Sequence, residues 1–229
     1  MWIVTTVNNR SRPRGPYAGT AERRREIISA AFEAFARGGF RGSSLQEICD
    51  AVGMSKPGLL HHFASKEELL EAVLEKREEM NQPPAGTKGL DMLVHLRNTA
   101  RVDQVTQGAV ALFVVMSAEA TNPSHPAHEF FVNRYDRAVR TIATALDEAR
   151  VRGELKENLD ATEAAQLIVS VMDGLQIQML LNPDMDRLAA LDTYLEQFLA
   201  QNVAKDYDGI WSRVFSNPPP SRQANLKEA

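Results

Sequence analysis

The side chains of this sequence that are best placed for chemistry are suited to binding anions and base edges. Hydroxyl, ammonium and imidazole groups gather between residues 43 and 66, and all of them can hydrogen-bond to phosphate oxygens. From the residues alone, the candidates are Ser43, Ser44, Ser55, Lys56, Pro57, Gly58, His61, His62 and Lys66, with Arg23 and Arg24 upstream. Such a set favours recognition of a polyanion such as double-stranded DNA.

Two capped helix starts and one tight turn must position these groups. Ser44 begins an S-x-x-E capping box, and Ser65 begins another. Between them Gly53 ends one predicted helix, and Ser55 can cap the next. Two short helices joined by a glycine-containing turn of about three or four residues form a helix-turn-helix, whose second helix fits the DNA major groove.

Each candidate group then has a predicted role at the groove. The start of the second helix, residues 55–58, would present small or polar groups to base edges. The helix starts at Ser44 and Ser65 would hold backbone phosphates, because free N–H groups point outward there. His61 and His62 would donate to phosphate from the far end of the helix.

Charge is distributed unevenly along the chain. The 229 residues have a net charge of −4, yet residues 1–66 contain ten Lys or Arg and five acids, a net of +5. The remainder therefore has a net charge of −9. A basic amino-terminal module on an acidic body is typical of a nucleic-acid binder with a second, different domain.

Helical periodicity continues through the rest of the chain, and no segment alternates long enough to predict a strand. We therefore expect an all-α protein. The first helix is expected to start at Thr20, and later helices near residues 66–80, 90–104, 109–120, 131–149, 161–181 and 188–199. The expected divisions are a disordered arm over 1–19, a DNA-binding head over 20–66, a helical body over 67–215 and a disordered tail over 216–229.

From about Arg24 to Leu74 the sequence resembles the TetR-type bacterial transcriptional regulators. The resemblance covers AAFEAFARGGF in the first helix, SLQEICDAVGMSKPGLLHHF in the helix-turn-helix, and F-x-S-K-E-x-L from Phe63 to Leu69. It implies nine or ten helices, a homodimer and a three-helix head that binds operator DNA. It also implies a larger variable domain that binds a small effector and dimerises.

Four residues occupy positions at which the family often contacts DNA, namely Gly58, Leu60, His61 and Lys66. Gly58 stands where threonine is frequent and Leu60 where tyrosine is frequent, so a phosphate-bonding hydroxyl is missing at each. Pro57 also occupies a position where glycine is common. Base reading would then rest more on close backbone approach and on the polar groups at the start of the helix.

The helix over residues 161–181 is apolar on two faces. One face can line a cavity while the other packs against a partner subunit, together with the apolar stripe of the next helix. The predicted interface residues are Val169, Ile177, Leu180, Leu188, Leu191, Leu195 and Phe198. The predicted effector-binding residues are Phe113, Met116, Phe131, Tyr135, Met172, Leu175 and Gln176. Their methionines and phenylalanines favour an apolar or aromatic effector.

The expected mechanism is repression that an effector relieves. The effector would bind the DNA-incompetent arrangement more tightly, and the helix over residues 66–80 would change the spacing of the two heads. One alternative is an activator or architectural DNA-binding protein that needs no effector. Another is a helical metal-binding enzyme built on His125 and His128, although both residues also fit the start of an ordinary helix.

Other classes of function lack a signal in the sequence. No dinucleotide-binding, P-loop, H-E-x-x-H or paired-cysteine motif is present, so neither an enzyme nor a cofactor is expected. The single cysteine, Cys49, lies on an apolar helical face and is expected in the core. It suits a reducing cytoplasm. No apolar run approaches the roughly 20 residues that span a bilayer, so no membrane partner is expected.

Overall fold

The computed structural model describes residues 16–215, apart from the side chains of residues 16–18 and 105. Within this range the chain forms ten α-helices and no extended strand, which confirms the expected all-α fold. The helices are α1 (Pro16–Gly42), α2 (Leu45–Val52), α3 (Lys56–His62), α4 (Lys66–Met80), α5 (Asp91–Val105), α6 (Gln107–Glu119), α7 (His128–Val151), α8 (Ala161–Leu181), α9 (Arg187–Asn202) and α10 (Tyr207–Phe215). The first helix begins at Pro16 instead of Thr20, and the rest of the predicted arm and the whole predicted tail lie outside the described residues.

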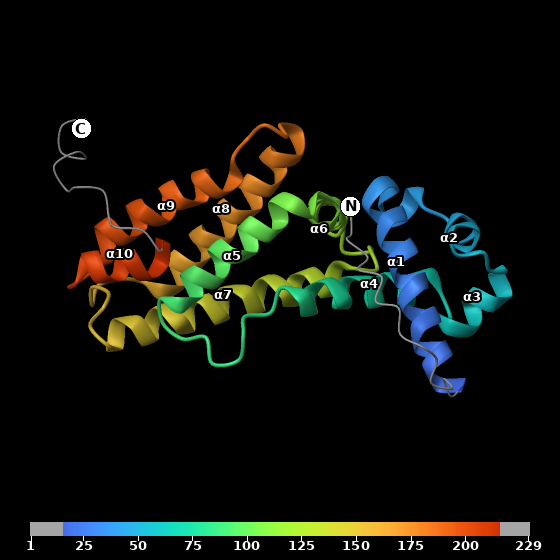
Figure 1. Ribbon diagram of the computed structural model, residues 1–229, viewed down its shortest axis with the longest axis horizontal. Helices are drawn as coiled ribbons and strands as arrows, with labels where there is room; N and C mark the ends of the chain where they lie inside the picture. Colours follow the sequence, from blue (N-terminus) through green and yellow to red (C-terminus); the bar gives the residue numbers. More distant parts are fainter. Residues whose placement is uncertain (1–15, 216–229) are drawn as a thin grey trace, which may run out of the picture.

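The molecule is elongated, with the helix-turn-helix at one end and α10 at the other (Figure 1). We call α1 to α3 the head and α5 to α10 the body. Helix α4 starts at the head and runs beside α7 into the body (Figure 1). The head and the near part of the body are therefore connected through one continuous helix.

The helix starts of the head are fixed by the predicted serines. Ser44 Oγ and Ser65 Oγ each accept a hydrogen bond from the backbone N–H three residues later, both at 3.1 Å. The acidic members of the two motifs make other contacts: Glu47 pairs with Arg37, and Glu68 accepts from the N–H of the residue before Ser65. Each motif thus caps its helix through the serine alone, without the reciprocal bond of a capping box.

The turn between α2 and α3 has the predicted chemistry. Gly53 has φ 61° and ψ 45°, in the left-handed region that glycine adopts without strain. Ser55 Oγ accepts from Gly58 N at 3.3 Å, and Pro57 sits in the first turn of α3, where its missing N–H costs nothing. The predicted helix-turn-helix is confirmed.

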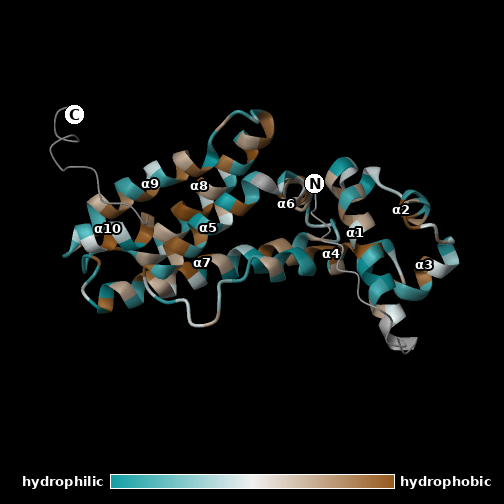
Figure 2. Cartoon of the chain, viewed as in Figure 1, coloured by the Kyte–Doolittle hydropathy of each residue, from teal (hydrophilic) through white to brown (hydrophobic). Residues whose placement is uncertain are grey.

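Two apolar clusters hold the helices together. One lies in the body and includes Leu93, Leu146 and Trp211. The other joins the head to the body: Phe35 of α1 packs in one cluster with the start of α4, with α6 and with Phe131 of α7. Figure 2 shows the apolar residues along the facing sides of these helices. Because the second cluster is continuous and closely packed, a displacement of α4 or α6 also displaces the side chains of the head that pack against it.

Helix α1 is kinked at Gly39, which has φ 69° and ψ −179°. A Cβ atom at this position would lie 2.2 Å from Glu119 Oε1 at the end of α6. The other oxygen of Glu119 accepts from Phe40 N at 2.9 Å. Glycine is therefore required here both by the backbone conformation and by the close approach of α6 to α1.

We expect Gly39→Ala to lower the free energy of unfolding by about 1–3 kcal/mol, because alanine is strained at this φ and meets the Glu119 carboxylate. Urea denaturation followed by circular dichroism measures the change. Gly42→Ala is the matched control, since Gly42 has no positive φ and no heavy atom within 4 Å of its built Cβ. Equal stability of the two variants would contradict a special role for Gly39.

Candidate nucleic-acid interface and effector cavity

The outer surface of α2 and α3 carries part of the predicted DNA-binding set. The exposed members are Ser44, Ser55, Lys56, Pro57, Leu60 and His61, and Gly58 and His62 are partly buried. The buried residue of α3 is Leu59, which anchors the helix in the head core. A Cβ atom on Gly58 would lie 3.0 Å from Met54 Cγ, so a larger residue there would have to displace the Met54 side chain.

Two of the predicted DNA contacts are turned into the protein. Ser43 is buried, and its hydroxyl lies 2.8 Å from the carbonyl oxygens of both Ala34 and Gly39. Lys66 Nζ donates to the carbonyl oxygens of Phe40 and Ser43. Burial lowers the pKa of Lys66. Burial of Ser43 speaks against its predicted contact with DNA, whereas Lys66 is only partly buried and its predicted contact stays a prediction. Both side chains satisfy carbonyl groups at or just after the end of α1.

Arg23 and Arg24 are likewise engaged internally. Arg24 Nη1 donates to His62 O at 2.6 Å, and its guanidinium lies 3.9 Å from the centre of the Phe63 ring. Arg23 Nη2 donates to Val52 O at 2.9 Å. Both arginines therefore satisfy free carbonyl groups at the ends of α3 and α2, and their contact with phosphate stays a prediction.

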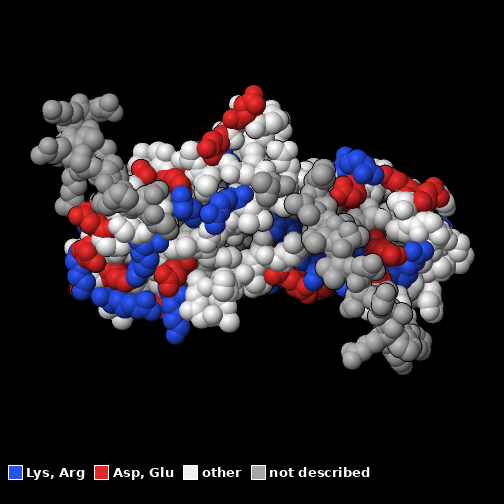
Figure 3. Space-filling model, viewed as in Figure 1, with Lys and Arg blue, Asp and Glu red and all other residues white. Residues whose placement is uncertain are grey.

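The basic residues of the amino-terminal module are divided between the described head and the segment that precedes it. Residues 16–66 contain seven Lys or Arg and five Asp or Glu, while Arg10, Arg12 and Arg14 lie outside the described residues. Figure 3 shows side chains of both signs over the head. Among the exposed Lys and Arg side chains in the described part of the head, Lys56 is the one that lies on α3, within the predicted base-reading segment.

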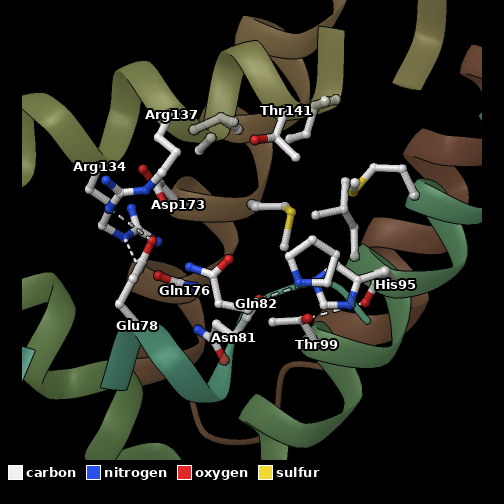
Figure 4. A pocket seen from close by; sticks show the side chains of 17 residues that line it. Glu78, Asn81, Gln82, His95, Thr99, Arg134, Arg137, Thr141, Asp173 and Gln176 are labelled. Atoms are coloured by element: carbon white, nitrogen blue, oxygen red, sulfur yellow. Dashed lines mark hydrogen bonds and ion pairs between the residues drawn. The ribbon is translucent and has the colours of Figure 1, made fainter. Parts of the chain in front are cut away.

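A cavity of about 160 Å³ lies where α4, α5, α7 and α8 meet (Figure 4). Its polar lining consists of Glu78, Asn81, Gln82, His95, Thr99, Arg134, Arg137, Thr141, Asp173 and Gln176. Its apolar lining consists of Pro83, Met92, Leu96, Ala138, Ile142, Val169 and Met172. No Phe, Tyr or Trp lines the cavity.

Most of the predicted effector-binding residues lie elsewhere. Met172 and Gln176 line the cavity as predicted, whereas Leu175 packs against the body core. The others, Phe113, Met116, Phe131 and Tyr135, belong to the apolar cluster that joins the head to the body. These large side chains fill the contact between helices and do not line the cavity.

The last turn of α4 forms one wall of the cavity and is held from two sides. Glu78 accepts from Arg134 Nε at 3.2 Å and from Arg137 Nη2 at 3.4 Å, both on α7. On the other side, His95 Nε2 of α5 donates to Asn81 O at 3.1 Å. Burial lowers the pKa of His95, which favours the neutral ring near pH 7. Figure 4 shows these groups around the cavity.

A buried ionic network lies next to this wall. The Asp103 carboxylate of α5 accepts from Arg77 Nη2 at 2.8 Å and from Arg187 Nη1 at 2.7 Å. All three side chains are buried, and Arg187 is completely so. Burial lowers the pKa of Arg77, and the neighbouring Asp103 offsets only part of this shift. Gln176 Nε2 lies 3.5 Å from Asp103 Oδ2, so a cavity residue touches the network that holds α4.

We expect Asp103→Asn to lower the free energy of unfolding by about 3–5 kcal/mol, because it leaves two buried guanidinium groups without a counter-charge. Chemical denaturation of the full chain measures this loss. Asp136→Asn is the matched control, since Asp136 and its partner Arg140 are both exposed and 3.8 Å apart, and exposed pairs contribute little. A loss for Asp103→Asn no larger than that for Asp136→Asn would contradict the role of the network.

The outer face of α8 carries apolar side chains that the chain itself does not cover. Leu167, Ile177 and Leu181 are 54%, 47% and 80% exposed, and no neighbouring atom lies within 4 Å of a Cβ built on Gly174. By length and composition α8 could cross a membrane, but a single helix of this kind is weak evidence for a span. Exposed apolar stripes of this length mark surfaces that pack against a partner.

The predicted interface residues fall into different environments. Leu191, Leu195 and Phe198 are buried in the body core, so they cannot contact a partner, and Leu188 packs against the same core. Val169 lines the cavity. The apolar stripe of α9, which was predicted to face a partner, therefore faces the core of the body. Ile177 is exposed as required and Leu180 is partly exposed, while sequence reasoning missed Leu167 and Leu181.

His125 and His128 have protein partners. His125 Nε2 lies 3.3 Å from Glu119 Oε2, and His128 Nδ1 donates to Ala120 O at 2.8 Å. Among the described residues, no group of three or more His, Cys, Asp or Glu side chains is arranged to hold a metal ion. The two histidines instead fix the loop between α6 and α7.

The chain is similar to known regulators along most of its length. A family model described as bacterial regulatory proteins of the tetR family matches residues 27–73, and one described as BetI-type transcriptional repressor, C-terminal, matches residues 94–204. The HTH-type transcriptional regulator UidR of Escherichia coli (strain K12) is 27% identical over 157 residues, which cover 66% of this chain and 78% of UidR.

Solved structures show the same fold. GusR of Salmonella enterica is 26% identical with a TM-score of 0.62, and the match covers 83% of this chain and 100% of GusR. SmeT of Stenotrophomonas maltophilia, solved as a complex with triclosan, is 21% identical with a TM-score of 0.69, and the match covers 81% of this chain and 94% of SmeT. The fold of these regulators thus extends over both the head and the cavity-containing body.

Proposed function

Because the chain belongs to the TetR family of bacterial transcriptional regulators and is a DNA-binding repressor with a ligand-binding C-terminal domain, we propose that it acts in the cytoplasm as a homodimer on a palindromic operator. A small effector in the cavity between α4 and α8 releases it. The observation that carries this proposal is the path of α4, whose first residue follows the helix-turn-helix and whose last turn lines the cavity.

The cavity favours a compact effector with an apolar body and several hydrogen-bonding groups. Its volume of about 160 Å³ is below the roughly 300 Å³ at the lower end of common ligand sites, so the effector is small or widens the cavity on binding. Gln82, Thr141 and Gln176 offer both donors and acceptors to such a molecule. The apolar part would rest on Ile142 and Met172.

Release follows if the effector binds more tightly to the arrangement that cannot bind DNA. An effector that displaces Glu78 from Arg134 and Arg137, or Asn81 from His95, removes contacts that hold the last turn of α4 and leaves the Arg77–Asp103 pair as its remaining anchor. The turn can then move, and the rigid helix carries the movement to the head.

A footprint on the DNA upstream of the gene, repeated with a panel of small molecules, tests the proposal as a whole. We expect a protected site with two-fold symmetry, because two heads related by a two-fold axis read two half-sites. We also expect at least one compound to remove the protection. Protection that no bound compound relieves would instead support an effector-independent DNA-binding protein.

Two lysines give opposite predictions for the head. Lys56 is exposed at the start of α3, so Lys56→Ala should weaken binding to all sequences and reduce the salt dependence of log Kd by about one unit per half-site. Lys66 is bonded to carbonyl groups, so Lys66→Ala should lower the thermal stability of the head and leave the salt slope unchanged. Operator titrations at several salt concentrations separate the two. A reduced slope for Lys66→Ala alone would contradict this assignment.

The dimer proposal rests on the exposed stripe of α8. Two copies packed through Leu167, Ile177 and Leu181 would remove these side chains from water, which stabilises the association. We expect Ile177→Glu to give a folded monomer in analytical ultracentrifugation and to lose operator affinity. Val151→Glu is the control, because Val151 is also exposed but lies at the end of α7. A dimeric Ile177→Glu variant would place the interface elsewhere.

A further inference from the structure

Leu60 is the most exposed large apolar side chain among the described side chains of residues 19–66, with 37% of its surface accessible. It lies outside both apolar clusters, unlike its neighbour Leu59, which is completely buried. A single exposed leucine is ordinary on a protein surface. Leu60 is of interest because it lies on α3, the helix proposed to enter the major groove, where an exposed side chain can contact base edges.

The exposed face of α3 has an apolar centre. At about 100° per residue, the order of side chains around the helix is Lys56, Leu60, Pro57 and His61. All four are exposed, so Leu60 and Pro57 lie in the middle and the two polar side chains lie at the edges. Gly58 adds no side chain to this face. A helix docked along this face therefore presents carbon, not hydrogen-bonding groups, to the floor of the groove.

The chemistry of the major groove decides what such a face can accept. Of the groups that base pairs present there, the 5-methyl group of thymine is apolar, and the remaining groups are hydrogen-bond donors or acceptors. Leucine pressed against a donor or acceptor removes water from it and supplies no replacement bond, which is unfavourable. Leu60 therefore favours thymine by contact and disfavours the other edges by desolvation.

We propose that Leu60, with Pro57 beside it, contacts a thymine methyl group in each operator half-site and makes thymine the preferred base there. The proposal rests on the DNA-binding function proposed above. It differs from a phosphate contact at this position because it specifies a base. It also assigns part of the sequence preference to a side chain that makes no hydrogen bond.

The test replaces thymine by deoxyuridine, which lacks the methyl group and keeps every hydrogen-bonding group. Half-sites are first selected from a random DNA library with the full-length protein. Each thymine is then replaced, symmetrically in both half-sites, and Kd is measured. We expect one position at which the loss is about fourfold per half-site, as for one buried methyl group. Replacement at the other positions should have a smaller effect.

A double-mutant cycle connects this loss to Leu60. In Leu60→Ala the penalty for deoxyuridine should fall to near onefold, whereas Leu60→Met keeps an apolar side chain and should keep the penalty. Val102→Ala, which truncates an exposed side chain on α5, is the control and should behave as the unchanged protein. Because Leu60 is outside the core, the variants should keep the thermal stability of the parent, which circular dichroism checks. Where Leu60→Ala binds too weakly to measure, Leu60→Val takes its place.

Three results would overturn the proposal. They are selected half-sites without thymine under α3, no thymine sensitive to loss of its methyl group, and a penalty that persists unchanged in the truncated Leu60 variant. Each of these leaves specific DNA binding intact. A library selection that enriches no sequence is a different failure, because it removes the proposed operator function and with it the basis for this inference.

Discussion

The Asp103 carboxylate, enclosed between the guanidinium groups of Arg77 and Arg187, is the interaction on which the arrangement of the molecule depends. It joins the last turn of α4, the last turn of α5 and the start of α9 at one buried point. Removing one partner of a buried ion pair costs far more than an exposed pair contributes, so α4 has one strongly preferred position. The head is carried by the other end of α4, and its orientation follows from this anchor.

The same helix brings regulation and DNA binding into one mechanical element. Its first turn packs in the core shared with α1 and α6, and its last turn faces the cavity. Two basic side chains near the start of α4 bond to backbone carbonyl groups at helix ends. Arg24 of α1 donates to His62 O, and Lys66 of α4 donates to Phe40 O. With these side chains bonded inside the head, the exposed polar candidates for DNA contact on α2 and α3 are Ser44, Ser55, Lys56 and His61.

Local features of the fold were predictable from the sequence, and features that depend on tertiary packing were not. Gly53 and Ser55 specify a turn and a cap through their own backbone and side-chain chemistry, so the helix-turn-helix was recognised correctly. Helix α10 was missed, although Ile210, Trp211, Val214 and Phe215 have helical spacing and all are buried. Phe113 and Leu195 were assigned to the cavity and the dimer interface because an apolar stripe does not reveal which partner covers it. The Asp103 network gave no signal, since an isolated acid or arginine in a sequence is indistinguishable from a surface residue.

The distance between the two heads of the dimer, measured with and without effector, tests the coupling through α4 most directly. Glu33 is exposed on α1, and the native Cys49 is buried, so Glu33→Cys provides one accessible thiol per subunit for a spin label. We expect the compound that removes the operator footprint to shift the distance distribution, and Asp103→Asn to broaden it without any compound. Release of the operator with an unchanged distance distribution would contradict coupling through a movement of α4.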